Sequence, residues 1–235
     1  MTPIALSEKS VELSFKLIRQ QKLKTLAVTA VRQNEGVSAF AYALARRVAT
    51  AHSRVLLIDM NMINCGQSKN LGENSVEWCP GKLDPRKDIS RLASTNLALL
   101  SAPSHLRREW IFQDGSTLEK MLQSLSEEYD LIIADLPPLL EKPSEIHTES
   151  LCSAFDKTLM IALSGSSDET QLSAARDLLE KAGVRLLGLV INDRHCPSLA
   201  DELKRQLTRL FFVPASVKGL LNRWLQDNSF LNQEF

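Results

Sequence analysis

The chain has 235 residues, of which 44% are hydrophobic and 24% charged, with nine glycines and nine prolines. This composition is that of a folded globular protein and excludes collagen-like, mucin-like and linker chains. Lysine plus arginine and aspartate plus glutamate number 28 each, so the formal net charge is zero. A neutral chain has no global field that attracts nucleic acid or anionic lipid, and we therefore expect no nucleic-acid partner.

The N-terminal segment and the cysteines indicate a cytoplasmic protein. The segment has no basic stretch followed by an apolar one, which a secretion signal would need. No later stretch approaches the ~18 uninterrupted apolar residues of a membrane span. The four cysteines stand far apart without a CxxC pair, which favours buried thiols in a reducing compartment over a disulfide framework.

Short apolar runs alternate with longer stretches of helical spacing, which is typical of βαβ units around a parallel sheet. We expect a single domain over residues 1–235, with an N-terminal helix at about 8–22 and a C-terminal helical segment at about 198–228. The expected strands are 25–31, 54–59, 97–101, 130–135, 157–163 and 185–191, and the helices between them are 38–51, about 118–125 and 168–182. The predicted fold class is α/β, a doubly wound, mostly parallel sheet with helices on both faces.

Two segments stand apart from this alternation. Residues 61–88 collect proline, glycine, asparagine and charged residues without a clear period, and we interpret them as a surface excursion over the strand ends. The run Ser164–Ser167 precedes a predicted helix, so we expect it to cap that helix, with anion binding as the alternative.

Polar residues follow three of the predicted strands. In a parallel sheet, ligands bind beyond the carboxyl ends of the strands. The loop of residues 31–38 follows the first strand, Asp59 ends the second, and Asp135 ends the fourth. Together they are typical of a phosphate loop (residues 31–38) beside an acidic pair (Asp59 and Asp135) that organises Mg²⁺.

Four segments in order resemble the motifs of one family. They are FKLIRQQ (15–21), NEGVSAF (34–40), VLLIDMN (55–61) and YDLIIADLPP (129–138). They are similar to YRxLRTN, GEGKST, VLLIDxD and YDxVIIDTPP in the P-loop domain of bacterial tyrosine kinases for capsule and exopolysaccharide synthesis, within the wider MinD/ParA group. The resemblance covers nearly the whole chain and implies a P-loop NTPase-like fold.

The resemblance also implies ligands for ATP or ADP with Mg²⁺. The segment at 182–192 resembles one that ends in an asparagine contacting adenine, here Asn192. The matching nucleotide-binding positions are Arg32, Asn34, Glu35, Gly36, Val37, Ser38, Ala39 and Asn192. Ser38, Asp59 and Asp135 match the Mg²⁺ ligands, which would act only if nucleotide binds.

The phosphate loop departs from the family motif where the chemistry needs specific groups. Val37 replaces the lysine whose ammonium reaches the β and γ phosphates. Glycine is missing at Val31 and Asn34, so fewer backbone N–H groups are free to curl around phosphate. Arg32 stands at the signature lysine of MinD/ParA proteins and could hold phosphate oxygens instead.

The acidic pair is interpreted as vestigial. Removing one transition-state donor typically costs ~10²–10³ in rate, and losing the phosphate-loop lysine should cost at least as much. Asn61 replaces the second acid of the family's DxD and is a poorer Mg²⁺ ligand. No residue is therefore predicted to be catalytic, and Asp59 and Asp135 remain only as possible metal ligands.

Two further family properties do not carry over. Self-phosphorylation needs a C-terminal tyrosine cluster, but the chain has only Tyr42 and Tyr129, so we exclude a tyrosine autokinase. Ring assembly uses an ExxRxxR pattern on the N-terminal helix, where Lys16 and Arg19 match but Glu12 is one residue out of place. We interpret those two cations as a solvated helix face.

The sequence thus predicts a pseudo-ATPase that acts by protein–protein binding in exopolysaccharide or capsule biosynthesis. The expected partner is a membrane-embedded chain-length, export or synthase protein that recruits the chain to the inner membrane face. The alternative is an active MinD/ParA-like ATPase that switches between a monomer and an ATP-sandwiched dimer. A third hypothesis is a regulator that shares this fold and is localised by its C-terminal helices, in the manner of a polar positioning protein. Neither the polysaccharide, the partner nor the oligomeric state follows from the sequence.

Overall fold

The computed structural model describes residues 8–61, 66–72, 74, 76–81, 83–92, 95–103, 115–141 and 147–193. The predicted C-terminal helical segment at about 198–228 lies outside these residues. So do Cys65 and Cys196, whereas the thiols of Cys79 and Cys152 are buried, as expected. None of the helices in the described ranges has the length and hydropathy that a bilayer span requires.

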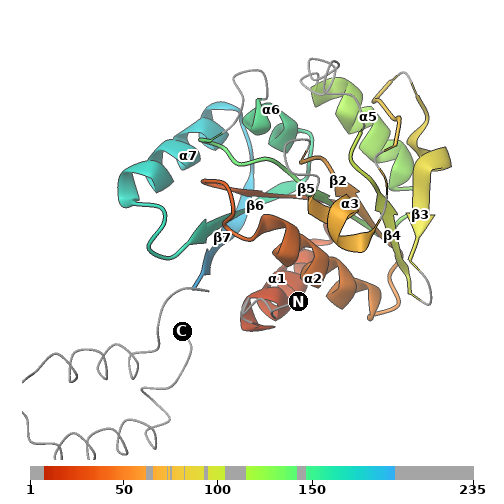
Figure 1. Ribbon diagram of the computed structural model, residues 1–235, viewed down its shortest axis with the longest axis horizontal. Helices are drawn as coiled ribbons and strands as arrows, with labels where there is room; N and C mark the ends of the chain where they lie inside the picture. Colours follow the sequence, from red (N-terminus) through yellow and green to blue (C-terminus); the bar gives the residue numbers. More distant parts are fainter. Residues whose placement is uncertain are drawn as a thin grey trace, which may run out of the picture. The chain divides into compact units, whose positions relative to one another are not determined.

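The secondary structure follows the predicted alternation (Figure 1). The helices are α1 (Glu8–Gln21), α2 (Val37–Ala49), α3 (Gly66–Leu71), α5 (Gly115–Leu125), α6 (Thr148–Ser153) and α7 (Glu169–Lys181), with a 3-10 helix η1 (Pro85–Asp88). The strands are β1 (Thr25–Ala30), β2 (Val55–Asp59), β3 (Ile89–Arg91), β4 (Leu97–Leu100), β5 (Leu131–Asp135), β6 (Lys157–Leu163) and β7 (Leu186–Asn192). Each predicted strand is present, with its ends displaced by no more than one residue.

The strands form one sheet in the order β3-β4-β2-β5-β1-β6-β7. All neighbours are parallel except β3 and β4, so the doubly wound, mostly parallel α/β class is confirmed. Strands β2, β5 and β1 are adjacent, which brings the acidic pair and the phosphate loop to one edge of the sheet. In register, Asp59 lies directly opposite Asp135.

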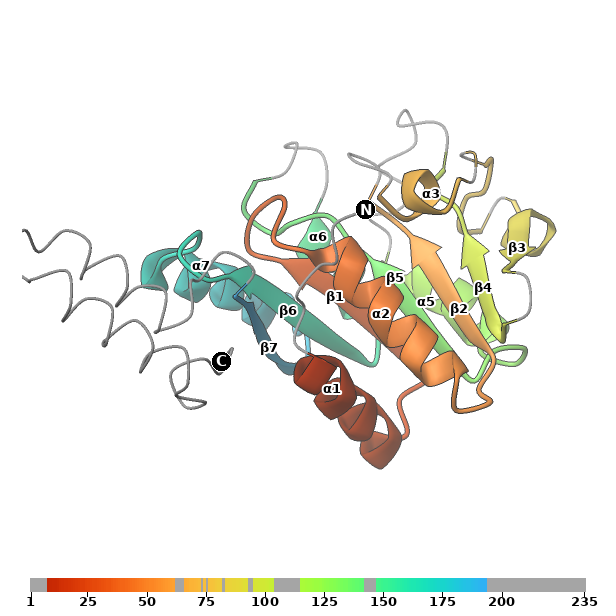
Figure 2. The same cartoon turned by 60° about the horizontal axis from the view of Figure 1, so that its bottom comes forward.

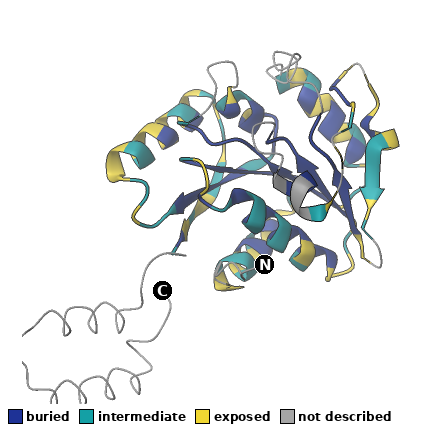
Figure 3. Ribbon diagram, viewed as in Figure 1, coloured by how far each residue is buried: buried dark blue, intermediate teal, exposed yellow. Residues whose placement is uncertain are grey.

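Helices cover both faces of the sheet (Figures 1 and 2). One apolar cluster joins α1 and α2 to the strands, and a second joins α5, α6 and α7 to the opposite face. Phe40, Leu44 and Val48 form the buried face of α2, as their spacing predicted. The central strands β1, β2 and β5 are buried along their whole length (Figure 3), which is typical of parallel strands between two helical layers.

The interpretation of residues 61–88 as a surface excursion is wrong for α3. Gln67 and Ser68 are buried, with 1% and 2% of their surface exposed. The physical reason is the buried carboxylate of Asp59, which needs hydrogen-bond donors that α3 supplies. The same region leads through η1 into β3, an antiparallel edge strand that was not predicted because three residues are too short to show a period.

Candidate functional site

The phosphate loop turns from β1 into α2 although it has only one glycine. Val31 continues the strand geometry, because its N–H donates to Ile161 O at 3.2 Å and its carbonyl accepts from Leu140 N at 3.1 Å. Asn34 has a φ of 63° and Gly36 a φ of 100°. Asparagine tolerates this left-handed region better than most residues. The loop therefore keeps its turn without glycine at the other two positions.

Val37, at the position where the resemblance predicts a lysine, belongs to the core. It is the first residue of α2, its side chain is 9% exposed, and it packs in the apolar cluster beneath the helix. No side chain caps the helix at Gly36. The first turn of α2 therefore offers backbone N–H groups and the Ser38 hydroxyl but no cation.

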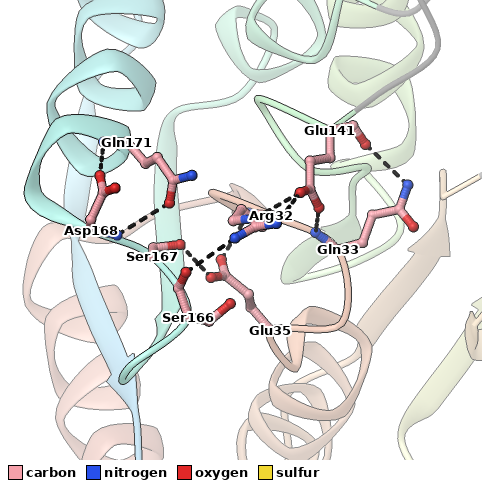
Figure 4. A network of polar contacts seen from close by, with 8 residues as sticks. All are labelled: Arg32, Gln33, Glu35, Glu141, Ser166, Ser167, Asp168 and Gln171. Atoms are coloured by element: carbon pink, nitrogen blue, oxygen red, sulfur yellow. Dashed lines mark hydrogen bonds and ion pairs between the residues drawn. The ribbon is translucent and has the colours of Figure 1, made fainter.

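Arg32 makes an ion pair with Glu141, a residue that sequence reasoning did not single out (Figure 4). Its Nε lies 2.7 Å and its Nη2 2.5 Å from Glu141 Oε1, and its Nη1 donates to Ser166 O at 3.2 Å. Glu141 also accepts from the N–H of Gln33 at 3.2 Å. Hydrogen bonding to Arg32 is the main cause that lowers the pKa of Glu141. The loop's cation is thus engaged within its own chain.

Glu35 is fully buried and ties the phosphate loop to the loop between β6 and α7. Its carboxylate accepts from Arg32 N at 2.9 Å and from Ser167 Oγ at 2.6 Å. The expectation that the run Ser164–Ser167 caps the next helix is wrong. Asp168 caps α7 by accepting from Gln171 N at 2.8 Å, in a reciprocal capping box that leaves Ser167 to bind Glu35 (Figure 4).

Asn192 packs against the phosphate loop. It ends β7, is 2% exposed, and its Nδ2 donates to the carbonyl of Glu35 at 2.9 Å. A Cβ atom at Gly36 would lie 2.6 Å from this Nδ2. The space beside Gly36 is therefore filled by the asparagine. The predicted positions in the loop and at Asn192 are brought together, while Ala39 lies in the first turn of α2, half-buried.

The acidic pair is fully buried, and α3 covers it. Asp59 Oδ2 accepts from the N–H groups of Gln67 and Ser68 at 3.1 and 3.0 Å and from Ser68 Oγ at 2.9 Å. Its Oδ1 accepts from Asn61 N at 3.2 Å. Burial raises the pKa of Asp59, and the bonds from Ser68 oppose that rise. Asp59 is therefore well supplied with donors.

Asp135 has fewer donors than Asp59. Its Oδ2 accepts from Gln67 Nε2 at 3.0 Å, and the same amide donates to the carbonyl of Ser38 at 2.6 Å. Its Oδ1 is buried and has no hydrogen-bond partner. Burial, followed by the charge of Asp59, raises the pKa of Asp135 to about 7. The Gln67 amide thus lies between Ser38 and the acidic pair, a position that sequence reasoning missed.

The acidic pair supplies carboxylate oxygens, which are the kind of ligand that Mg²⁺ prefers. Mg²⁺ is usually held by one or two carboxylates together with phosphates and water, and the unpartnered oxygen of Asp135 is a ligand of that kind. Within the described residues, no group of three or more His, Cys, Asp or Glu side chains could hold a metal ion. The residues therefore fit Mg²⁺ only as a partial ligand set beside Ser38.

The N-terminal helix packs against α2 through an ion pair. Glu12 accepts from Arg47 at 2.7 and 3.2 Å, and the Arg47 guanidinium lies over the Phe15 ring at 4.0 Å. Lys16 and Arg19 are exposed, as expected of a solvated helix face. The carboxylate that lies nearest the ring-assembly pattern is thus bound within its own chain.

Comparison with known proteins gives relatives of one kind. No family model matches the chain. The tyrosine-protein kinase CpsD of Streptococcus agalactiae is 25% identical over 174 residues, which cover 72% of this chain and 75% of the relative.

Solved structures extend the comparison to the fold. The kinase domain of the Escherichia coli tyrosine kinase ETK superposes with a TM-score of 0.67 at 20% identity, over 81% of this chain and 79% of that domain. The septum site-determining protein MinD of Pyrococcus horikoshii, complexed with Mg-ADP, gives a TM-score of 0.56 at 19% identity, over 71% and 68% of the two chains. The sequence relatives of this chain are therefore bacterial tyrosine kinases, and its fold is the P-loop fold of their kinase domains and of MinD.

Proposed function

We propose that this chain is a catalytically impaired P-loop protein of exopolysaccharide or capsule biosynthesis that acts by binding another protein. One observation carries the proposal: the phosphate loop has no cation available for a phosphate group. Val37 fills the position of the lysine and packs into the core, and Arg32 is paired with Glu141.

Phosphoryl transfer depends on cations that neutralise the charge on the transferring group. Removing one preorganised donor of this kind typically lowers the rate ~10²–10³-fold. A valine side chain supplies no charge, and α2 presents only its N–H groups and Ser38 at that place. We therefore propose that the chain does not turn ATP over at a useful rate.

Nucleotide, if it binds, would be a ligand in this proposal. The N–H groups of Val37, Ser38 and Ala39 would hold its phosphates, and Ser38 with the acidic pair would hold Mg²⁺. When bound, Mg²⁺ would neutralise charge between the phosphates and the two carboxylates. MinD, which shares the fold, is complexed with Mg-ADP, and this supports retention of the site as a binding surface.

The proposed partner is a membrane-embedded chain-length, export or synthase protein that recruits the chain to the inner membrane face. The support is the resemblance of four motifs to kinases of capsule and exopolysaccharide synthesis, together with the tyrosine-kinase relatives. A P-loop fold with an altered loop favours a role in assembly over a role in phosphate transfer.

The experiment measures ATP binding and turnover of the native protein beside two lysine variants. Val37→Lys restores the motif cation, and Ala51→Lys adds the same charge at an exposed position just beyond α2. We expect no turnover by the native protein or Ala51→Lys, and Mg²⁺-dependent binding and turnover by Val37→Lys. Because Val37 is in the core, circular dichroism and thermal melting must show that this variant folds.

Polymer output in the producing cell is the second readout of the same experiment. We expect output to persist in a strain carrying Ser38→Ala with Asp135→Asn. We expect it to be lost with Leu220→Asp and Trp224→Asp, which place charges at apolar positions of the predicted C-terminal helical segment at about 198–228. The opposite pattern contradicts the binding role. Turnover by the native protein, with ATP changing its oligomeric state, would instead support the nucleotide switch and contradict the proposal.

A further inference from the structure

The guanidinium of Arg32, on the phosphate loop, is paired with a carboxylate of the same protein. We propose that the Glu141 carboxylate is an internal occupant of the anion position beside Arg32, and that a ligand bearing phosphate reaches Arg32 only by displacing it. This inference deepens the proposed function, because it identifies what blocks the loop and the class of ligand that would open it.

Glu141 makes the contacts that an external anion would make. One carboxylate oxygen lies 2.7 Å from Arg32 Nε and 2.5 Å from Nη2, and the other accepts the backbone N–H of Gln33 at 3.2 Å. A guanidinium together with a loop N–H is the donor set that binds phosphate oxygens in proteins. Figure 4 shows Glu141 reaching from the segment after β5 onto this part of the loop.

The loop has no second cation with which to bind an anion. Arg32 is the only lysine or arginine in residues 31–38. A carboxylate on Arg32 therefore occupies all of the loop's positive charge. A phosphate that approached the occupied loop would meet the negative charge of Glu141 instead of a free guanidinium.

The ion pair between Arg32 and Glu141 is weak enough for a ligand to break it. The side chains of Arg32 and Glu141 are 35% and 40% exposed, and ion pairs at such exposure are weak and screened by salt. Arg32 has independent supports, because its Nη1 donates to Ser166 O and its N–H donates to buried Glu35. Departure of the carboxylate would therefore leave the guanidinium in place, ready to bind a phosphate.

The chain offers a matched control pair away from the loop. Arg86 and Glu128 are joined through Nε and Oε1, with side chains 36% and 51% exposed. Arg86 also donates to the carbonyl of Ser124 at 3.2 Å, as Arg32 does to Ser166. Glu128→Gln therefore removes the same charge from the same kind of pair without touching the phosphate loop.

The experiment is calorimetric titration with inorganic tripolyphosphate, without Mg²⁺ and at low salt. We expect Glu141→Gln to bind at least about tenfold more tightly than the native protein, because the variant loses a competing and repelling carboxylate. Glu128→Gln should stay within about twofold of the native protein. The double variant Arg32→Ala with Glu141→Gln should lose the gain. A parallel titration with ATP separates a nucleotide from another source of phosphate.

A second measurement does not depend on affinity. Phenylglyoxal modifies accessible guanidinium groups, and peptide mapping reports the reaction at Arg32. We expect modification at Arg32 to be slow in the native protein, faster in Glu141→Gln and suppressed by tripolyphosphate. Equal modification rates, or equal tripolyphosphate affinity in the native protein and Glu141→Gln, would overturn the proposal.

The two proposals can fail separately. ATP turnover by the native protein contradicts the impaired function but leaves the role of Glu141 to the tripolyphosphate titration. A gain by Glu128→Gln as large as that by Glu141→Gln would show a general charge effect and overturn the internal occupant alone. Thermal melting of each variant confirms that these comparisons are made on folded protein.

Discussion

The phosphate loop and the acidic pair lie at the ends of neighbouring strands, yet they satisfy their charges in opposite ways. Arg32 in the loop is paired with a carboxylate at the surface, where both side chains are more than a third exposed. Asp59 and Asp135 are fully buried, and α3 gives them N–H and hydroxyl donors in place of a cation. The cation of the loop is neutralised, whereas the acidic pair has no cation beside it.

This difference in burial indicates a different role for each region. An exposed ion pair contributes little to stability and opens easily, which suits control of ligand access. A buried carboxylate without a cation carries a large desolvation cost, so the acidic pair should dominate the pH dependence of stability. Three sets of variants test this difference, and their expected effects on stability decrease from Asp135 through Gln67 to the Arg32–Glu141 pair.

Asp135→Asn should have the largest effect. The pKa of Asp135 in the folded protein is about 7, above the ordinary value of 3.8, because the side chain is buried beside Asp59. The folded state thus holds a proton that the unfolded chain releases, and this stabilisation is present at low pH and lost as pH rises through 7. The variant should lack most of this loss and be more stable at pH 8 by on the order of a few kcal/mol.

Urea unfolding at pH 5 and pH 8 measures this effect. Asp130→Asn is the control, because the pKa of exposed Asp130 is lowered by hydrogen bonding to Arg54 and both pH values lie above its titration. Its stability should therefore change with pH as that of the native protein does. The same pH dependence in Asp135→Asn and the native protein would contradict the buried charge.

Gln67→Ala should have an intermediate effect. The Gln67 amide donates to Asp135 and to the Ser38 carbonyl, and removing a buried donor of this kind costs about 1–3 kcal/mol. The variant should recover part of that loss when MgCl₂ is added, because a cation can then approach the unpartnered oxygen of Asp135.

Thermal melting with and without MgCl₂ checks this second expectation. Gln123→Ala is the matched control, since the Gln123 amide is exposed and donates to Glu119 at 3.3 Å, away from the acidic pair. Mg²⁺ should raise the melting temperature more in Gln67→Ala than in the native protein or the control. An equal rise in all three proteins would show that Gln67 and the cation do not compete.

The Arg32–Glu141 pair should have the smallest effect on stability. A double-mutant cycle with Arg32→Ala and Glu141→Ala should give a coupling free energy below about 1 kcal/mol that shrinks as salt is added. Urea unfolding at two salt concentrations measures it. A salt-independent coupling free energy above about 2 kcal/mol would show that the ion pair is a structural contact and not one that ligands displace.

Sequence reasoning found the elements whose patterns are long and missed those that are short. The runs that became β1, β2 and β5 are apolar throughout, and their burial follows from that composition. The three residues of β3 and the six of α6 are too few to show a period. The apolar sequence of β7 did not indicate that β7 is an edge strand of the described sheet. At that edge, Leu189 and Ile191 are 44% and 63% exposed.

In the candidate site, too, some contacts were predictable from the sequence and others were not. The proximity of Asp59 and Asp135 was predictable, because the carboxyl ends of parallel strands meet at one edge. The contacts of Glu141 and Gln67 depend on the path of irregular segments, which residue spacing does not encode. The available signals were weak: a glutamate shortly after Pro137-Pro138, and a glutamine-serine pair in a region without a period.

The contact between Gly36 and Asn192 bears on how loop sequences of this kind are read in other proteins. Two constraints require glycine at position 36. Its backbone is left-handed, and a Cβ atom there would lie 2.6 Å from the amide nitrogen of Asn192. Neither constraint involves a nucleotide. Selection for folding alone would therefore preserve this glycine whether or not a nucleotide binds. A glycine at this motif position thus reports backbone geometry, and genome surveys that count it as evidence of a working nucleotide site would count a folding constraint as chemistry.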